Sequence, residues 1–392
     1  MGECAAESAM VVGTDEARRR RRLLAFGNPM VDVLLHVTSE FVSSHNLIHG
    51  EAIQAHVPDD ARQRLLNEAL AVPGMIRAAG GSALNSARTI QCLLPPMSSV
   101  FVGAVGDDSN GAFLFHESSK QGVEMHLQTV PNMATSTCVC YITPDHERTL
   151  VVHGAAHHHY TFNATFVAAL DTVDIVYIVS FVLSASTRYE CAVHAATHLR
   201  PNQLLCMNLS STNLLHKPVV MERLLTLLPS THVVLGNANE FRALAIALDI
   251  PDTSMPALAQ AIATHPAVSD HILLIVTDAA NPTWVVHKSE SMACPVQRVQ
   301  DSTAFVVRDT TGAGDAFVGG FLAGLMTNCN VRACVELGHV CARRCVQQMG
   351  CQIQLTAGER NRCQDIIQAA RTADADALPL FTWLERKRAL TS

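Results

Sequence analysis

The chain has 392 residues, which predicts two or three structural units, and 48% of its residues are hydrophobic while only 16% are charged. So much apolar material supports a large core and excludes disorder over most of the length. A net charge of −7 argues against nucleic acid as the main partner, and the longest apolar run, residues 173–185, is too short to span a membrane. The 13 cysteines are odd in number and include no C-x-x-C pair, a pattern typical of buried thiols in a reducing cytoplasm.

The N-terminal 22 residues are predicted to form a separate arm. They lack the apolar stretch of a signal peptide and end in five consecutive arginines at positions 18–22. We expect this arm to be flexible and solvated; a nuclear address or an anion-binding tail is the alternative interpretation. The expected location is therefore the cytoplasm, with the nucleus as an additional location if the arginines act as an address.

The rest of the chain alternates between apolar runs of strand length and longer helical patterns. The runs lie at residues 23–27, 100–106, 173–179, 204–209, 233–236 and 272–277. The helical patterns lie at residues 83–94, 109–121, 188–199, 219–228, 240–248 and 255–264. Strands that are apolar on every residue suit a sheet covered on both faces. The alternation predicts an α/β fold, with a wound, mainly parallel sheet and helices on both faces.

Two regions depart from this alternation. Residues 31–78 contain one isolated helical pattern, and residues 123–152 have the pattern of several strands without helices. We expect these two regions to form a small β-rich lid over one edge of the sheet. The large α/β domain then comprises residues 23–30, 79–122 and 153–371, which leaves residues 372–392 as a C-terminal tail of uncertain structure.

The strongest local signal is the stretch Asp-Thr-Thr-Gly-Ala-Gly-Asp-Ala-Phe at residues 309–317, followed by the apolar pattern of a buried helix. Gly312 and Gly314 let the backbone approach a ligand closely, and a helix N-terminus attracts anions. Asp315, beside such a site, is suited to take a proton from a hydroxyl that attacks a phosphorus atom. On this stretch alone, an ordinary glycine-rich turn with Asp315 at a favourable helix end is an equally good interpretation.

This stretch resembles the second signature of the ribokinase-like (pfkB-type) carbohydrate kinase superfamily. Residues 79–87 resemble the first glycine motif of that superfamily, and Asn237 and Glu240 match its Asn-x-x-Glu element. The resemblance covers roughly residues 23–355, and within the superfamily residues 27–32 are most similar to the adenosine kinases. It implies a large α/β domain with a small lid, and transfer of a phosphoryl group from ATP to the 5′-hydroxyl of adenosine with Mg²⁺ as cofactor.

The resemblance also implies roles for individual residues. For phosphoryl transfer, Asp315 would be the catalytic base, and Gly312, Ala313 and Gly314 would form the anion hole. Arg148 of the lid would lie over the phosphates. The nucleoside would be bound by Asn28, Asp32, Gly80, Gly81, Ser82, Asn85 and Phe181. ATP would contact Asn237, Glu240, Thr277, Thr310, His339, Gly312 and Gly314. Asn237 and Glu240 would act at Mg²⁺ through bound water, although a helix cap with its capping-box glutamate explains these two residues equally well.

Four positions differ from the family pattern. Ala52 stands in place of a glutamine near the purine, and Val182 in place of an aromatic ring against the base. Ala279 replaces the glycine of a Thr-x-Gly element, in which Asp278 adds negative charge near the expected phosphates. Loss of one stacking ring removes about 1 kcal/mol of base affinity. The alternative functions are therefore a kinase for another nucleoside or a sugar, and a weakly active binding paralogue of the same fold.

A histidine group, His153 with His157, His158 and His159, has no role in the resemblance. Its near-helical spacing suits zinc, but no cysteine or carboxylate of ligand spacing lies beside it, so a polar loop of neutral histidines is favoured. The expected partners are adenosine and ATP, with no nucleic acid and no membrane, and the chain is expected to be a monomer.

Overall fold

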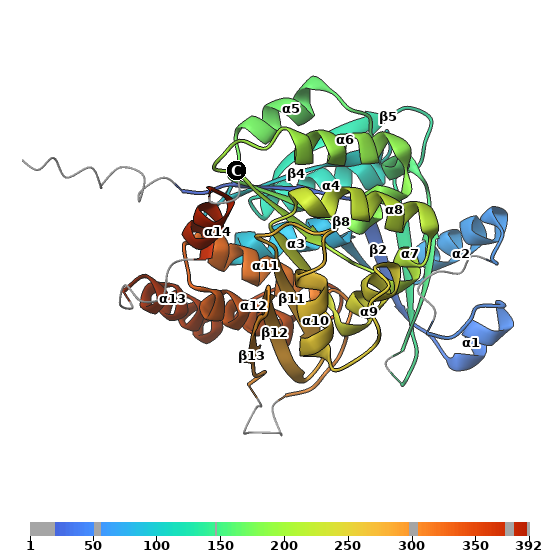
Figure 1. The fold of residues 1–392 in the computed structure, drawn as a ribbon. Helices are drawn as coiled ribbons and strands as arrows, with labels where there is room; N and C mark the ends of the chain where they lie inside the picture. The colour runs from blue at the N-terminus through green and yellow to red at the C-terminus, as the bar shows by residue number, and fades with distance from the viewer. Residues whose placement is uncertain (1–19, 51–55, 146, 298–304, 373–379, 390–392) are drawn as a thin grey trace, which may run out of the picture.

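The structure is a computed structural model that describes residues 20–50, 56–145, 147–297, 305–372 and 380–389. Two sheets organise these residues (Figure 1). The larger sheet has nine strands, in the order β13 (Glu290–Cys294), β12 (Asn281–His287), β11 (Leu273–Asp278), β10 (Val233–Asn237), β9 (Leu204–Asn208), β8 (Ile175–Val179), β1 (Leu23–Phe26), β4 (Ser99–Gly106) and β5 (Glu124–Val130). The smaller sheet has four strands, in the order β3 (Ile76–Gly80), β2 (Met30–His36), β6 (Thr137–Ile142) and β7 (Arg148–His153).

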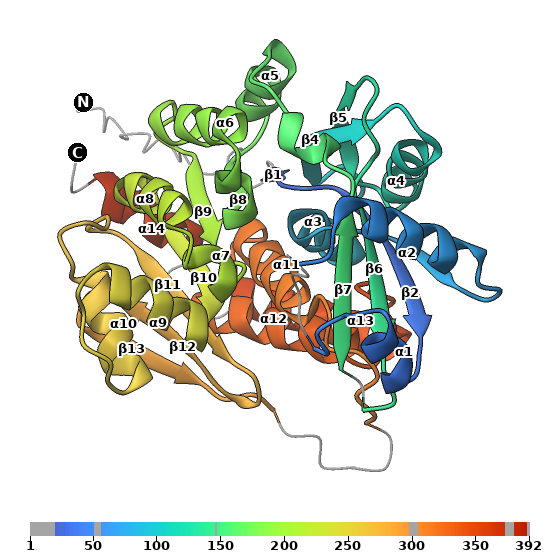
Figure 2. The ribbon, with the colours of Figure 1, turned by 90° about the vertical axis from the view of Figure 1, so that its right-hand side faces the viewer.

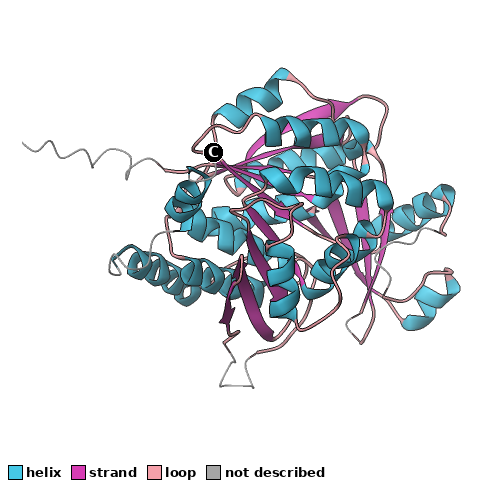
Figure 3. Ribbon diagram, viewed as in Figure 1, coloured by secondary structure: helices cyan, strands magenta, loops and turns pink. Residues whose placement is uncertain are grey.

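The seven strands from β11 to β5 in the large sheet run parallel to their neighbours, and β12 and β13 are added antiparallel at one edge. Their apolar residues are buried because helices cover both faces of the sheet, as Figure 3 shows. The predicted α/β fold with a wound, mainly parallel sheet is therefore confirmed. No helix of the described residues is long and apolar enough to cross a membrane.

Helices fall into two layers around the large sheet (Figure 2). One layer contains α6 (Ser186–Thr197), α8 (Pro218–Leu227), α9 (Ala238–Ala247) and α10 (Met255–Ala263). The other contains α3 (Ser82–Leu93), α11 (Ala313–Met326) and α12 (Val331–Cys345), which pack on one another. The remaining helices are α1 (Ser39–Ser44), α2 (Asp59–Ala71), α4 (Ser109–Lys120), α5 (Ala164–Asp171), α7 (Thr212–Leu215), α13 (Ala357–Thr372), α14 (Leu380–Ala389) and the short 3-10 turns η2 (Ala156–His159), η3 (Ser180–Ser184) and η4 (Leu228–Ser230).

The smaller sheet lies beside α11 and α12 (Figure 2). It contains most of the segments predicted for the lid, but β5 pairs in parallel with β4 of the large sheet. The assignment of all of residues 123–152 to the lid is therefore wrong for β5, because its alternating pattern fits an edge strand as well as a strand of a separate sheet. The division of the chain into a large domain and a lid stays a prediction.

Both ends of the described chain are more ordered than the sequence predicts. Arg21 places its guanidinium 4.0 Å from the ring centre of Phe381 on α14, and Arg22 forms an ion pair with Glu124. The expectation of a solvated arm is thus wrong for these two arginines, whereas Arg18 and Arg19 lie outside the described residues. Residues 380–389 of the predicted tail form α14, which buries Phe381 and its neighbour Leu384 in the core.

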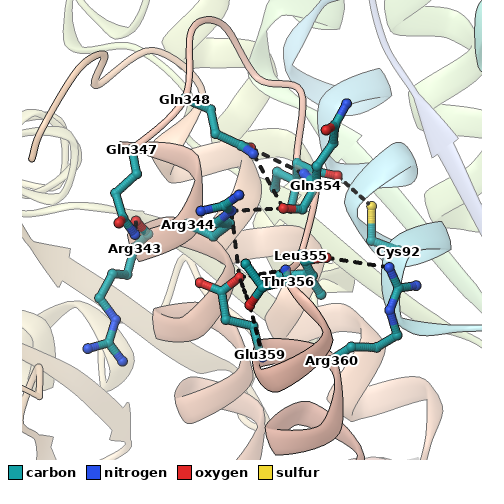
Figure 4. A network of polar contacts seen from close by, with 11 residues as sticks. Cys92, Arg343, Arg344, Gln347, Gln348, Gln354, Leu355, Thr356, Glu359 and Arg360 are labelled. Atoms are coloured by element: carbon teal, nitrogen blue, oxygen red, sulfur yellow. Dashed lines mark hydrogen bonds and ion pairs between the residues drawn. The ribbon is translucent and has the colours of Figure 1, made fainter. Parts of the chain in front are cut away.

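A polar network joins α12 to α13 and to α3 (Figure 4). Arg344 donates from Nε to the carbonyl of Gln354 over 2.8 Å and lies 3.6 Å from the carboxylate of Glu359. Thr356 and Glu359 form reciprocal bonds that cap α13. Cys92 of α3 donates to the carbonyl of Ile353 over 3.2 Å, so the chain after α12 is tied to the helix that carries Asn85.

Candidate active site

Helix α11 begins at a glycine turn that the sequence marks correctly. Gly312 precedes the first residue of the helix and has a φ of +72°, in the left-handed region that favours glycine. A Cβ at this position would overlap Cys351, whereas a Cβ on Gly314 would meet no atom within 4 Å. Gly314 is exposed, so the N–H groups at the start of the helix are accessible to a ligand. This arrangement suits an anion such as a phosphate.

Asp315 is held at this helix start by two residues of α3. Ser82 donates to its Oδ1 over 2.6 Å, and Asn85 donates from Nδ2 to its Oδ2 over 2.9 Å. Burial raises the pKa of Asp315 to about 6, and these two hydrogen bonds act in the opposite direction. The carboxyl group is therefore oriented and basic enough to accept a proton near neutral pH. Ser82 and Asn85, expected at the nucleoside, contact Asp315 in this structure.

Asp32 lies over the first glycine motif. A Cβ on Gly80 would overlap its carboxylate, and a Cβ on Gly81 would overlap the carbonyl oxygen of Asn28. Gly81 has a φ of +102° at the start of α3. Four of the residues predicted to bind the nucleoside, Asn28, Asp32, Gly80 and Gly81, are thus brought together from β2, β3 and the loop before β2. Burial raises the pKa of Asp32 to about 7, although the nearby charge of Arg88 lowers it.

A cavity of about 90 Å³ opens beside Asp315 toward the large sheet. Its lining includes Asn237, Glu240, Thr277 and Gly314, all predicted to contact ATP. Asn237 caps α9, with its Oδ1 accepting from the N–H of Glu240 over 3.0 Å, and Glu240 returns the bond to the N–H of Asn237 over 2.9 Å. The capping-box interpretation of this pair is therefore confirmed, and it does not conflict with a role at the cavity.

The chemistry of this cavity fits Mg²⁺. Two carboxyl groups, those of Glu240 and Asp315, line it together with the amide of Asn237, and oxygen ligands are those that Mg²⁺ prefers. Burial and, to a smaller extent, the charge of Asp315 raise the pKa of Glu240 to about 7. A divalent cation would relieve this repulsion between like charges.

A second cavity of about 250 Å³ includes His339 in its lining, together with Val340 and Arg343 of the same helix. The Nε2 of His339 lies 2.8 Å from the hydroxyl of Thr283, and its ring centre lies 5.5 Å from that of Phe317 on α11. Phe317 also lines the cavity beside Asp315, so His339 of the second cavity lies next to a residue of the first. Thr310 is exposed just before the glycine turn.

Arg148 contacts the first residue of the signature stretch. Its guanidinium forms an ion pair with Asp309, whose side chain is completely buried. Asp309 also accepts from the N–H of Thr311 over 2.6 Å and from that of Gly350 over 2.7 Å. Asp309 therefore links the small sheet, the glycine turn and the chain after α12. The sequence marks Asp309 as the first residue of the motif, but no local pattern shows that it is buried.

Three of the four positions that differ from the family pattern lie in the described residues. Val182 is completely buried, so it offers no surface to a base, whereas Phe181 beside it is partly exposed. Ala279 adopts a φ of +47°, in the region where an alanine is strained, and Asp278 accepts a 3.0 Å bond from Asn281 across the same turn. Ala52 lies outside the described residues.

Two buried arginines near the site are not predicted from the sequence. Arg88 of α3 donates to the carbonyl of Ala79 and lies close enough to Asp32 to lower its pKa. Arg188 of α6 is completely buried. It falls on the apolar stripe of its helix with Cys191 and Ala195, which is the one sequence signal for its burial.

The histidine group contacts the protein interior. His157 pairs with the hydroxyl of Ser136, and His158 lies 2.9 Å from a guanidinium nitrogen of Arg188. Within the described part of the chain, no three His, Cys, Asp or Glu side chains are arranged to hold a metal ion. The contacts of His157 and His158 therefore favour a structural role over zinc binding.

Comparisons with known proteins agree with this geometry. A model described as "pfkB family carbohydrate kinase" matches residues 43–357, so α13 and α14 lie almost entirely beyond it. The adenosine kinase of Saccharomyces cerevisiae is 30% identical over 334 residues, which cover 84% of this chain and 95% of that relative. The adenosine kinase of Schizophyllum commune is 28% identical over 342 residues, covering 85% of this chain and 97% of that relative.

Solved structures are similar over the same extent. The structure of Anopheles gambiae adenosine kinase in complex with P1,P4-di(adenosine-5) tetraphosphate has a TM-score of 0.74 and 26% identity, covering 85% of this chain and 97% of that one. The structure of Trypanosoma brucei brucei adenosine kinase has a TM-score of 0.76 and 25% identity, covering 84% of this chain and 100% of that one.

Proposed function

Because the chain belongs to the pfkB family of carbohydrate kinases, we propose that it transfers the γ-phosphoryl group of ATP to the 5′-hydroxyl of adenosine, giving AMP and ADP. The glycine turn, the oriented carboxyl group of Asp315 and the cavity beside it support phosphoryl transfer. The relatives that act on adenosine support the choice of acceptor.

The chemistry follows from the position of Asp315 at the start of α11. A pKa of about 6 leaves Asp315 largely ionised at pH 7.5, so it can take the proton from an acceptor hydroxyl as the oxygen attacks the γ-phosphorus. The N–H groups of Ala313 and Gly314 are oriented by the helix toward the same point, where they stabilise the negative charge on the transferred group. Positioning and charge stabilisation are what phosphoryl transfer chiefly requires.

The acceptor is held on the other side of Asp315. Asp32, above the glycine motif, is a hydrogen-bond acceptor for a sugar diol, and Asn28 adds amide contacts. Phe181 offers a partly exposed ring for a base. Arg148 is tied to Asp309, so contact of Arg148 with the phosphates requires this ion pair to open.

Mg²⁺ would be held through water by Glu240 and Asn237 and would neutralise charge on the ATP phosphates. The triphosphate would lie along the cavity beside Gly314, with the base of ATP toward His339. Thr277 and Thr310 would supply hydroxyl contacts along this path.

The observation that carries this proposal is the pair of hydrogen bonds from Ser82 and Asn85 that orient Asp315 at a helix start. The test is an assay with γ-labelled ATP and a panel of adenosine, guanosine, inosine, ribose and fructose. We expect labelled 5′-AMP, with kcat/KM for adenosine at least tenfold above that for any other acceptor. A sugar or another nucleoside accepted better than adenosine would refute the choice of acceptor, and no transfer to any acceptor would refute the kinase.

A further inference from the structure

Arg188 is a buried cation whose hydrogen-bond partners in the described chain are neutral. Its side chain is completely buried, and no Asp or Glu of the described residues is among the groups that shift its pKa. Burial lowers its pKa to about 10, so the guanidinium stays charged at neutral pH. A buried charge that lacks a counter-ion is costly and needs neutral hydrogen-bond acceptors around it.

Three neutral groups accept hydrogen bonds from Arg188. Nη1 donates to the Oδ1 of Asn28, and Nη2 donates to the hydroxyl of Ser184 over 2.8 Å. Nη2 also lies 2.9 Å from the Nδ1 of His158. A guanidinium can only donate, so Nδ1 of His158 must be the acceptor and the ring is neutral, with its proton on Nε2.

His158 is an exposed residue, but its Nδ1 is turned toward the buried arginine. Its pKa is lowered to about 4 by loss of solvent around the ring, and then by the positive charges of Arg188, His159 and Lys217. The neutral form is therefore the dominant one at physiological pH. This gives the histidine group, which the family resemblance leaves unexplained, a defined partner.

These hydrogen bonds connect Arg188 to two residues of the proposed acceptor site, Asn28 and Phe181. Ser184, which accepts from Arg188, donates its own proton to the carbonyl of Phe181 over 2.9 Å. Asn28 lies against the glycine motif, because its carbonyl oxygen occupies the space that a Cβ on Gly81 would need. Arg188 thus contacts Asn28 directly and reaches Phe181 through one hydroxyl.

Arg188 also decides which end of the Asn28 amide a ligand can use. The Oδ1 end is taken by the guanidinium, and a flipped amide would place N–H groups against N–H groups. The Nδ2 end is left to donate to a ligand. An arginine at this place therefore makes Asn28 a donor only, and it adds positive charge behind that donor.

We propose that Arg188, held by His158 and Ser184, is a positioning residue that makes Asn28 a hydrogen-bond donor to the acceptor nucleoside. This inference rests on the proposed function. The chemical class it selects is a neutral nucleoside that presents an acceptor atom, a ring nitrogen or a ribose oxygen, to the amide of Asn28.

The first test compares Arg188→Met, which keeps the volume and removes the donors, with the parent enzyme and with His159→Leu as a control on the exposed neighbour. We expect Arg188→Met to fold, because it removes an unpaired buried charge. KM for adenosine should rise about tenfold while KM for ATP and kcat stay within about twofold, the size expected for one hydrogen bond of the ligand. An unchanged KM for adenosine, or an equal rise in both KM values, would overturn the inference.

A second test examines the route through Asn28 and His158. In the Asn28→Ala background, Arg188→Met should add less than a twofold change, since the two residues act through one contact. His158→Asn, which keeps an acceptor near the place of Nδ1, should retain the parent KM for adenosine, whereas His158→Leu should raise it. Full additivity of Asn28→Ala and Arg188→Met would contradict the inference. If the parent enzyme itself does not phosphorylate adenosine, the proposed function fails, and that outcome is separate from an unchanged KM in the variants.

Discussion

Three carboxyl groups at the site share one electrostatic property. Burial raises the pKa of Asp315 to about 6, and those of Asp32 and Glu240 to about 7. Asp315 in turn raises the pKa of each of the other two. Such clustered, perturbed acids are typical of catalytic sites, where stability is given up for function.

Asp32 gives a prediction for stability against pH. Its carboxyl group has a higher pKa in the folded chain, about 7, than the 3.8 of an exposed aspartate. The free energy of unfolding is therefore highest below about pH 4 and falls as the pH rises toward 7. Asp32→Asn removes this loss of stability at high pH, because an amide does not ionise. We expect the variant to be more stable than the parent above pH 7, by about 2 to 4 kcal/mol in free energy of unfolding. Urea unfolding at pH 4, 6 and 8 measures this difference, and equal stabilities at pH 8 would contradict the assigned burial.

At the scale of the element, the start of α11 uses its two glycines for different purposes. Gly312 is required by its positive φ and by the packing of Cys351, whereas Gly314 faces open space. The first glycine therefore serves the fold and the second leaves room for a ligand.

Alanine substitutions separate these two purposes. Gly312→Ala should lower the free energy of unfolding by about 1 to 3 kcal/mol, because of the left-handed φ and the overlap with Cys351. Gly314→Ala should keep the stability of the parent but raise KM for ATP or lower kcat at least tenfold, because its Cβ enters the space for the phosphate. Thermal unfolding and steady-state kinetics on both variants check this contrast. Loss of stability in Gly314→Ala with normal kinetics would reverse the assignment.

The turn between β11 and β12 carries strain of its own. Ala279 has a φ of +47°, whereas its neighbour Ala280 does not have a positive φ. Ala279→Gly should therefore raise the free energy of unfolding by about 1 kcal/mol, and the matched Ala280→Gly should lower it or leave it unchanged. Chemical unfolding of the two variants measures the difference. If both substitutions destabilise the chain equally, the strain at Ala279 is refuted.

At the scale of the whole molecule, Arg148 and Asp309 connect the small sheet to the start of α11. Removing one partner of a buried pair leaves the other charge unpaired, so Arg148→Met should cost about 3 kcal/mol of stability. Asp309→Asn in the same background should recover part of this loss, because the amide oxygen can still accept from Thr311 and Gly350. Unfolding free energies of the single and double variants test the connection; no recovery would show that the charge of Asp309 is not the source of the cost.

Much of this architecture can be predicted from periodicity alone. The runs that become β1, β4, β8, β9, β10 and β11 are mostly apolar with no alternation of polar residues, so their burial on both faces can be predicted from the sequence. The edge strands are harder to predict from the sequence, because β5 and β13 are partly exposed and alternate like any surface strand. The short hairpin of β12 and β13 has no apolar run of its own to mark it.

The site was predictable where a motif fixes the backbone and less so where tertiary packing decides. The glycine turn before α11 follows from Gly312 and Gly314. The contacts of Asp309 and Arg188 do not follow from the sequence. The apolar stripe of α6 indicates the burial of Arg188, but no local pattern indicates the burial of Asp309 or the partner of either side chain. Ser82 and Asn85 belong to the glycine motif that the sequence marks, but their bonds to Asp315 depend on how α3 packs on α11.

The most direct measurement of the central claim is single-turnover transfer from ATP to adenosine by Asp315→Asn, alongside equilibrium binding of adenosine. The account predicts a rate on the order of 10³-fold below that of the parent, with adenosine bound within a few-fold of the parent affinity. It also predicts that the transfer rate of the parent decreases when the pH is lowered through about 6, because the carboxyl group of Asp315 then takes up a proton. A variant that transfers phosphoryl groups within tenfold of the parent rate would contradict the assignment of Asp315 as the base.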